Sequence, residues 1–245
     1  MLTPGQLTGR DDSHLLALAG GHRLQPAAAA AFTRLQQDAA AAGFRLAIAS
    51  SYRSYERQRA IWNGKAAGER PVHDDAGNPV AILALPVAER IRAILRFSAL
   101  PGTSRHHWGT DLDVYDAAAV PADYALQLSP QEVAHDGPFG PLHCWLDARM
   151  VEGGSQGFYR PYDRDRGGVA PERWHLSYAP LATSCAGRLT AEQLRACWDC
   201  DAEPLLLRAE LEIMLPELLA RYVEVPLDWC PERFARAGLE RGSGS

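Results

Sequence analysis

One segment, TDLDVYD at residues 110–116, constrains the fold of this chain more than any other. Polar and apolar residues alternate along it, and successive side chains of a β-strand point to opposite faces. The pattern therefore predicts a strand with Asp111, Asp113 and Tyr115 on one face and two apolar residues on the other. Two carboxylates share one side of this strand, and a loop that contains two histidines, PGTSRHHWG, leads directly into it.

The rest of the first 180 residues alternates between predicted helices and strands. The Ala-rich stretch at 26–42 begins with Pro26 and is followed by Gly43, which are typical start and stop signals of a helix. Further helices are predicted at 54–65, 86–98 and 141–151, and further strands at 44–50, 157–162 and 173–178.

The sequence changes character after Pro180, and residues 189–223 predict two helices. Pro216 is expected to kink or interrupt the second one. An apolar stripe on a helix either binds a partner or packs on the parent domain, and packing is much the commoner. We expect packing for the stripe that recurs here at helical spacing, Leu207, Leu211, Met214, Leu218 and Tyr222.

Composition limits the function classes. The 245 residues carry a net charge of −5, with both signs mixed along the chain. Nucleic-acid binding needs clustered Lys and Arg, so we expect no nucleic-acid partner and take peptides or small molecules as substrates. No stretch approaches the ~20 apolar residues of a membrane span. The N-terminus shows neither a cationic leader nor a signal-peptide apolar run, which favours a cytoplasmic protein as written and a periplasmic one if a leader was trimmed.

The cysteines do not form the pattern of a secreted disulfide framework, because their number is odd. The one CxxC pair, Cys197 and Cys200, has no second pair at zinc-finger spacing. We favour two helix-borne thiols that pack as small apolar groups over a redox or metal site. The five cysteines are Cys144, Cys185, Cys197, Cys200 and Cys230.

The loop and the strand around Gly109 offer two metal ligands. Glycine allows a tight backbone turn, so that His106 before it and Asp113 after it converge on one point. Zinc accepts histidine nitrogen and carboxylate oxygen, and a catalytic zinc site uses three protein ligands plus water. A third ligand must then come from elsewhere in the chain.

Glu172-Arg-Trp-His175 supplies a third ligand and a base together. When His175 binds the metal, the glutamate three residues earlier lies close to the water-filled fourth position. Zinc lowers the pKa of its water to about 7, and Glu172 takes the proton as the water attacks a carbonyl.

The combined pattern S-x-H-x-x-G-x-D-x-D, followed by E-x-W-H, resembles the LAS zinc metallopeptidases, and most closely their D-alanyl-D-alanine carboxypeptidase and dipeptidase branch. SSYRSYERQ at 50–58 is similar to an upstream segment of that family. Trp145-Leu and GFYRPY at 157–162 resemble the segment before its E-x-W-H. The similarity spans residues 44 to 180, in the order of the family.

The resemblance implies a site and a fold. His106, Asp113 and His175 match the ligands of one zinc ion, with His106 preferred over His107, and Glu172 matches the catalytic base. Arg53 matches the arginine that polarises the scissile carbonyl, and its fixed fork of donors suits that task. Ser104 and Gln58 match positions that line the substrate site. Asp111 stands where many relatives have alanine, as a support for the ligands or as a solvated residue. The implied fold is α+β, a small mainly antiparallel sheet flanked by helices, with a helical C-terminal extension.

The leading hypothesis is a zinc D,D-carboxypeptidase for peptidoglycan-derived peptides or muropeptides. An L,D-carboxypeptidase or a D-Ala-D-Ala dipeptidase on the same site is the alternative, and a zinc-bearing binding module without turnover is the alternative from another class. For the domains we predict a zinc metallopeptidase domain over 1–180, a helical extension over 181–241 packed on it, and a flexible tail at 242–245.

Overall fold

The computed structural model describes residues 1–224 and contains a four-stranded sheet at its centre. The strands are β3 (Leu46–Ser50), β4 (Asp111–Asp116), β6 (His175–Tyr178) and β5 (Phe158–Tyr159), in this spatial order and antiparallel throughout. The predicted α+β class with a small antiparallel sheet is confirmed. β5 is shorter than the predicted 157–162, because Pro161 follows soon after it and has no N–H to donate to a strand ladder.

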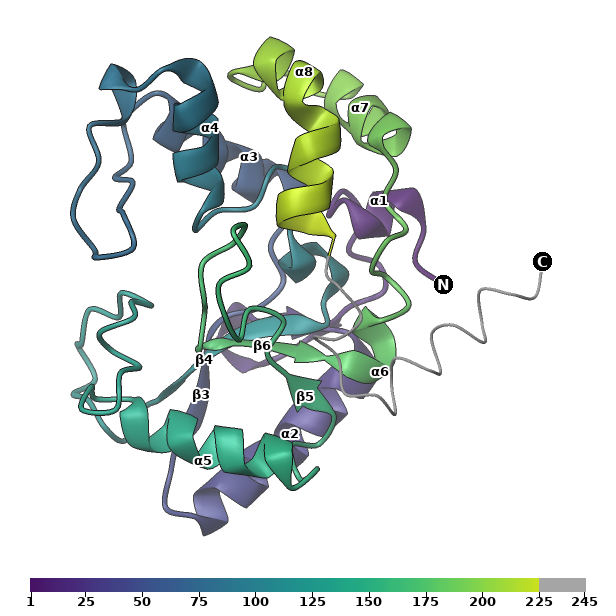
Figure 1. The fold of residues 1–245 in the computed structure, drawn as a ribbon. Coiled ribbons are helices and arrows are strands. Elements are labelled where there is room, and N and C mark those ends of the chain that lie inside the picture. The colour runs from purple at the N-terminus through teal and green to yellow at the C-terminus, as the bar shows by residue number, and fades with distance from the viewer. Residues whose placement is uncertain (225–245) are drawn as a thin grey trace.

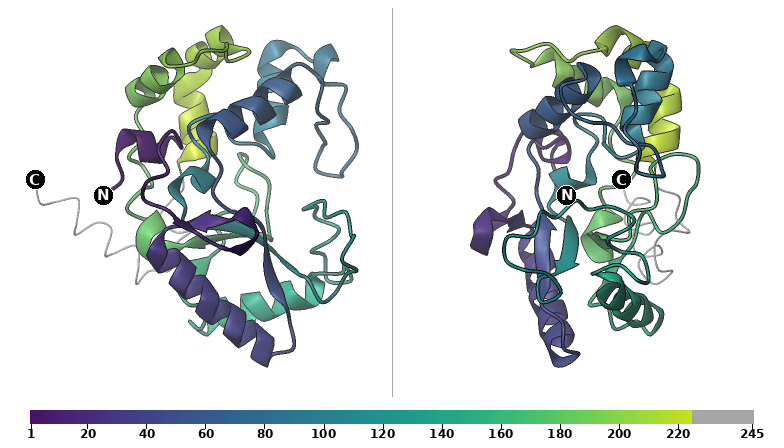
Figure 2. Two further views of the ribbon diagram at one scale, coloured as in Figure 1. Left: turned by 180° about the vertical axis from the view of Figure 1, so that it is seen from behind. Right: turned by 90° about the vertical axis from the view of Figure 1, so that its left-hand side faces the viewer.

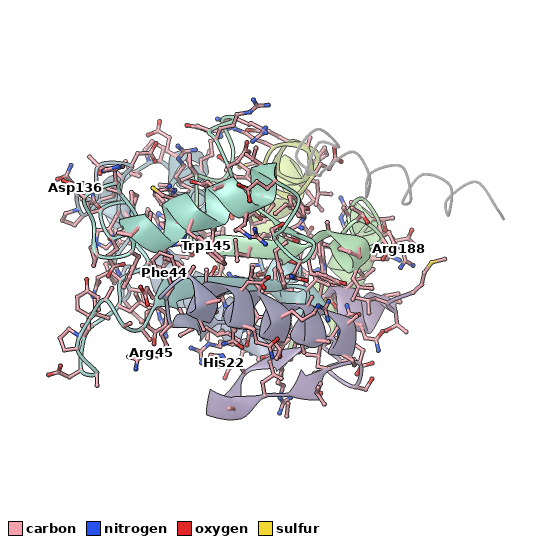
Figure 3. All side chains as sticks on the ribbon, turned by 90° about the horizontal axis from the view of Figure 1, so that it is seen from below. His22, Phe44, Arg45, Asp136, Trp145 and Arg188 are labelled. Carbon is pink, nitrogen blue, oxygen red and sulfur yellow. The ribbon has the colours of Figure 1, made fainter. Side chains whose placement is uncertain are left out.

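Two helices lie under the sheet, α2 (Pro26–Ala41) and α5 (Gly140–Val151) (Figure 1). Seen from below, they run side by side, with Phe44 after α2 and Trp145 on α5 between them (Figure 3). The two rings are 5.8 Å apart. The helices bury an apolar core against the strands that includes Phe32, Leu35, Leu112, Val114, Leu146, Phe158 and Leu176. The apolar side of the predicted strand 110–116 therefore faces this core.

A second helical layer lies on the other side of the sheet (Figures 1 and 2). It contains α3 (Tyr55–Ala66), α4 (Val87–Leu95), α7 (Ala191–Asp199) and α8 (Arg208–Leu218). Ser54 caps α3 by accepting a hydrogen bond from the Arg57 backbone N–H. The core of this layer is separate from the first and includes Tyr55, Trp62, Ile91, Ile94, Leu194, Trp198, Leu211 and Leu215.

The C-terminal helices pack on α3 and α4, so the apolar stripe of α8 is used for packing. Leu211 and Leu218 are buried there, and Leu207, Met214 and Tyr222 are partly buried against the same core. Pro216 lies inside α8, and the chain changes to a π-helical turn, η4 (Leu219–Val223), directly after it. The predicted residues 225–241 of the extension, the tail at 242–245 and Cys230 lie outside the described residues.

The described cysteines are free, but the two cysteines of the CxxC pair differ in burial. Cys197 is buried in the helical core, whereas Cys200 is exposed at the end of α7, so the packing interpretation holds for Cys197 alone. Across residues 1–224, no helix is long and apolar enough to cross a membrane.

Several short elements were not predicted from the sequence. The loop expected at 101–109 contains a 3-10 turn, η3 (Arg105–Trp108), which ends at Gly109 with φ 68°. The others are α1 (Pro4–Leu7), β1 (Leu16–Ala17), η1 (Ala19–Gly21), β2 (Arg23–Leu24), η2 (Ile82–Ala84) and α6 (Ala179–Ala182).

Candidate active site

Strand pairing brings the central side chains together. Asp113 on β4 is directly opposite His175 on β6 and also pairs with Ser50 on β3. The turn η3 precedes β4 and places His106 over the same point, because Gly109 adopts the left-handed conformation that reverses the chain. The tight turn predicted around Gly109 is therefore present.

His106, Asp113 and His175 form a buried cluster whose potential ligand atoms lie within 4.8 Å of one another. His106 Nε2 is 3.3 Å from Asp113 Oδ2, and His175 Nδ1 is 3.2 Å from Asp113 Oδ1. The two imidazole rings are 4.8 Å apart and nearly perpendicular, so their nitrogens approach Asp113 from different directions. Residues up to 69 positions apart in the sequence thus face a single point.

The second ring nitrogen of each histidine is held by an acceptor. His106 Nδ1 donates to the carbonyl of Ser51 at 2.8 Å, and His175 Nε2 lies 3.0 Å from Asp111 Oδ1. The other two ring nitrogens, His106 Nε2 and His175 Nδ1, are directed at Asp113. Asp113 Oδ1 is buried and has no hydrogen-bond partner among the described residues, since the 3.2 Å contact with His175 lacks hydrogen-bond geometry. Two imidazoles and an unsatisfied carboxylate oxygen fit a zinc ion.

Asp111 supports His175 and is itself neutralised by Arg105. The Arg105 Nε donates to Asp111 Oδ1 at 2.8 Å, and its Nη2 donates to Ser177 Oγ and to the Tyr159 hydroxyl. Burial opposes ionisation of Asp111, but Arg105 and His175 still hold the pKa of this carboxyl well below its usual range. The supporting role weighed for Asp111 is therefore the one its position favours, because carboxylates behind metal-binding histidines fix the ring and its tautomer.

Glu172 lies beside the cluster with its Oε2 3.7 Å from His175 Nδ1. Its backbone N–H donates to Tyr162 and its carbonyl accepts from His175, so the glutamate sits in a tight turn just before β6. Burial raises the pKa of Glu172 to about 7, against the opposing charges of His175 and Arg53. A carboxyl group with such a pKa exchanges a proton readily near neutral pH.

Arg53 lies between β3 and α3 and faces the same cavity. Its Nη1 donates to Gln58 Oε1 at 2.8 Å, and its Nη2 lies 3.4 Å from Ser50 Oγ. Burial lowers the pKa of Arg53, while Asp113 and Glu172 favour its charge. Gln58 is fully buried and is not among the cavity-lining residues, and its side chain holds Arg53. Its contact with substrate stays a prediction.

His107 has a different place from His106. Its Nδ1 donates to the Arg53 carbonyl at 2.7 Å, and burial lowers its pKa to about 3. The ring packs so closely on Gly9 that a Cβ at that glycine would lie 2.3 Å from His107 Nδ1. The Gly9 carbonyl in turn accepts hydrogen bonds from the Tyr52 hydroxyl and the Tyr55 backbone N–H. His107 therefore braces the segment that carries Arg53, and the cluster uses His106.

A cavity of about 450 Å³ opens over the cluster between the sheet and the upper helices. Ser104 is one of its lining residues, and Tyr162 packs its ring 5.1 Å from that of His175. Two long loops, 67–81 and 117–138, extend on the same side of the molecule (Figure 1) and both contribute to the lining. They approach each other where Gly77 faces the Gln131 side chain. The cavity has the size of a site for a small peptide.

Comparison with known proteins identifies the class. The model of the VanY family, described as D-alanyl-D-alanine carboxypeptidase, matches residues 21–181, which is well over half of the chain and includes the whole cluster. The class is therefore that of peptidases that act on peptidoglycan peptides. The chain belongs to the D-alanyl-D-alanine carboxypeptidase family.

Two proteins of Haemophilus influenzae (strain Rd), both described only as uncharacterized, are also similar. One is 50% identical over 103 residues, 40% of this chain and 70% of that protein. The other is 33% identical over 101 residues, 40% of this chain and 75% of that protein.

Among solved structures, VanYB in complex with D-Alanine-D-Alanine is 24% identical, covers 69% of this chain and 78% of that one, and has a TM-score of 0.49. The LdcB LD-carboxypeptidase is 20% identical, covers 70% of each chain and has a TM-score of 0.47.

Proposed function

We propose that this protein is a zinc-dependent D,D-carboxypeptidase that hydrolyses the C-terminal peptide bond of peptidoglycan-derived peptides. The observation that carries the proposal is the convergence of His106, Asp113 and His175 with Glu172 and Arg53 on the wall of one cavity. A purely structural zinc site would be closed by a fourth protein ligand and would need neither the glutamate nor the arginine.

Three atoms of this chain would hold the zinc, His106 Nε2, His175 Nδ1 and an Asp113 carboxylate oxygen. The backbone carbonyl of Ser51 and the carboxylate of Asp111 keep the two rings in the required tautomers. When bound, zinc supplies a Lewis acid that acidifies water and polarises the scissile carbonyl.

Glu172 moves the proton in the proposed reaction. Its carboxylate accepts the proton of the attacking water and, once protonated, returns that proton to the nitrogen of the leaving amino acid. A pKa near 7 suits both steps, because neither form is strongly favoured at neutral pH.

Arg53 stabilises the negative charge that develops on the carbonyl oxygen. The guanidinium remains charged despite burial. Gln58 fixes its orientation through one hydrogen bond, and Arg53 has further N–H groups for a ligand in the cavity that it lines. Donors that are held in place before the reaction lower its barrier because they need no reorganisation as charge forms.

The C-terminal helices belong to this proposal as part of the substrate site. Tyr222 and Val223 of η4 line the cavity. The Arg221 Nε donates to the carbonyl of Gly167, in the loop that leads to Glu172. We propose that the extension from residue 181 packs on the peptidase domain of residues 1–180 and completes the wall of its cavity.

The proposal is tested by zinc quantification together with a mass-spectrometric assay on peptides that end in D,D or L,D linkages, including the free dipeptide D-Ala-D-Ala. We expect one zinc per chain and loss of the terminal D-alanine from D,D peptides. Cleavage of L,D peptides only would identify an L,D-carboxypeptidase, and cleavage of the free dipeptide only would identify a D-Ala-D-Ala dipeptidase.

The matched variant is Glu172→Gln, which keeps the shape of the side chain but cannot accept the proton. It should retain zinc and lose about 1,000- to 10,000-fold in kcat, the upper part of the range of general acid–base catalysis, because Glu172 acts twice. Turnover at the wild-type rate would remove Glu172 from the mechanism. Zinc binding without turnover in the wild-type protein would favour the non-catalytic binding module.

A further inference from the structure

Lys65 is the only lysine of the chain. The other 24 of its 25 Lys and Arg residues are arginines. It lies near the end of α3, and its side chain lines the cavity together with Arg53 and Glu172. Neither the metal cluster nor the proposed proton transfers use it. A single compact ammonium group in a chain that otherwise relies on arginine calls for a specific explanation.

The contacts of Lys65 are few. Its Nζ donates to Ser98 Oγ at 2.7 Å, and this is its one side-chain hydrogen bond within residues 1–224. An ammonium group has three donors, so two of them remain for other partners. No carboxylate of the described chain lies within ion-pair distance of Lys65, although twelve arginines in residues 1–224 have such a partner.

Arg53 shares this property. Its side-chain partners are the neutral groups of Gln58 and Ser50, and no described carboxylate forms an ion pair with it. The two cations lie close enough to repel one another, and burial together with Arg53 lowers the pKa of Lys65 to about 8. Lys65 therefore still carries its charge at neutral pH, in a partly buried position where an unpaired charge is costly.

Two partly buried cations on one wall of a cavity select an anion as ligand. In the proposed reaction, Arg53 faces the scissile carbonyl, and the terminal carboxylate lies one residue, about 3.8 Å of chain, beyond it. Lys65 lines the same cavity and lies near enough to Arg53 to feel its charge. Glu172 is also near, but it is assigned to the water and the leaving nitrogen.

We propose that Lys65 binds the C-terminal carboxylate of the peptide and that Ser98 holds the ammonium group in place for this contact. The inference rests on the proposed carboxypeptidase function and makes Lys65 the residue that distinguishes a free chain end from an internal peptide bond. Lysine suits this position as a compact charge on a flexible stem, whereas the broad fork of a second arginine beside Arg53 would require more room.

The kinetic test compares two substrates, diacetylated L-Lys-D-Ala-D-Ala and the same peptide with a C-terminal amide. The amide removes only the charge that Lys65 is proposed to bind. Lys65→Met should lower kcat/KM for the free acid by about 10- to 100-fold, the range of one charge-assisted hydrogen bond, mainly through KM. The rate on the amide should change by no more than about 3-fold.

Arg195→Met is the matched control, since Arg195 is exposed on α7 and its loss removes the same charge far from the cavity. It should leave both substrates unaffected. Equal losses of Lys65→Met on acid and amide would mean that the lysine only maintains the structure, and the proposal would be wrong.

A binding test does not depend on turnover. Because the chain has one lysine, protein labelled with ¹³C at the lysine ε-carbon gives a single side-chain NMR signal. In the zinc-loaded Glu172→Gln variant, this signal should shift with the free acid and stay in place with the amide. Equal shifts would overturn the proposal.

The two tests also separate the two hypotheses. If the wild-type protein cleaves neither substrate but the lysine signal responds to the acid alone, the catalytic proposal fails and the carboxylate subsite stands. If the protein cleaves the acid and Lys65→Met retains the wild-type preference for the acid over the amide, the catalytic proposal stands and the carboxylate subsite at Lys65 fails.

Discussion

The two sides of the cavity treat their charges differently. On the sheet side, Arg105 pairs with Asp111, and Asp111 pairs with His175. On the helical side, Arg53 and Lys65 have only neutral hydrogen-bond partners among the described residues. Charges that are satisfied internally hold a fixed geometry, which a metal site needs, whereas charges without partners are available to a ligand. We infer that the sheet side holds the metal, whereas the helical side offers its charges to the substrate.

The largest loss of activity that tests this comparison should come from Arg53→Met. The substitution removes a prearranged donor from the developing oxyanion, so we expect kcat to fall by about 100- to 1,000-fold. Zinc content should stay at the wild-type level, because the side-chain hydrogen bonds of Arg53 go to Gln58 and Ser50 and not to His106, Asp113 or His175, the proposed ligands. Arg57→Met, an exposed arginine on the first turn of α3, serves as the control. A loss of zinc in Arg53→Met would show that the two sides are not separate.

The next effect tests the sheet side. Asp111→Asn removes the charge behind His175 and leaves Arg105 buried without its counter-ion, so zinc affinity should fall by about 10- to 100-fold. Competition with a chromogenic chelator measures this affinity. Asp116→Asn, at the other end of β4, is the matched control, since Asp116 is buried and accepts backbone hydrogen bonds from Arg45 and Ala118 far from the cluster.

We expect Asp116→Asn to lower the melting temperature while its zinc affinity remains that of the wild type. If both variants weaken zinc binding to the same extent, the effect comes from the stability of the sheet rather than from the support of His175.

The smallest predicted effect is a gain in the stability of the ligand-free protein. Lys65→Met replaces an unpaired, partly buried charge with an apolar side chain of similar length, so the ligand-free protein should become more stable by about 1 kcal/mol, or 2–4 °C in Tm. Calorimetry at several pH values checks the cause. The pKa of Lys65 is lowered to about 8 from an unfolded value near 10.5, so its charge disfavours folding below pH 8.

The penalty shrinks between pH 8 and 10.5, because the unfolded chain then binds more protons than the folded one at this position. The gain of Lys65→Met over the wild type should therefore narrow as the pH rises through this range. A constant difference at every pH would assign the effect to packing.

Local sequence patterns predicted most of the architecture. Alternation located β4, and Pro26 and Gly43 bounded α2, because these signals act within a few residues. The family resemblance, confirmed by the match to residues 21–181, supplied the fold class and drew attention to His106, Asp113, His175 and Glu172. These residues do meet in space, while their roles remain predictions.

The rest depends on contacts between distant segments. No local pattern shows that Gln58 lies under Arg53 rather than in the cavity, or that Arg105 faces Asp111 across a turn. Lys65 was missed because a lysine near the end of a helix is typical of a solvated residue. Its position in the cavity follows from how α3 packs on the segment around Ser98, which lies 33 positions further along the chain.

The close approach of Gly9 to His107 has a practical consequence for anyone who engineers this protein. Gly9 has φ 79°, and its carbonyl and α-carbon touch three residues on or beside the segment that carries Arg53. We infer that the first ten residues hold Arg53, the proposed oxyanion-binding residue, in position. Shortening the N-terminus to aid expression or crystallisation would remove this support for Arg53. Loss of activity in a shortened protein would therefore not count against the proposed function.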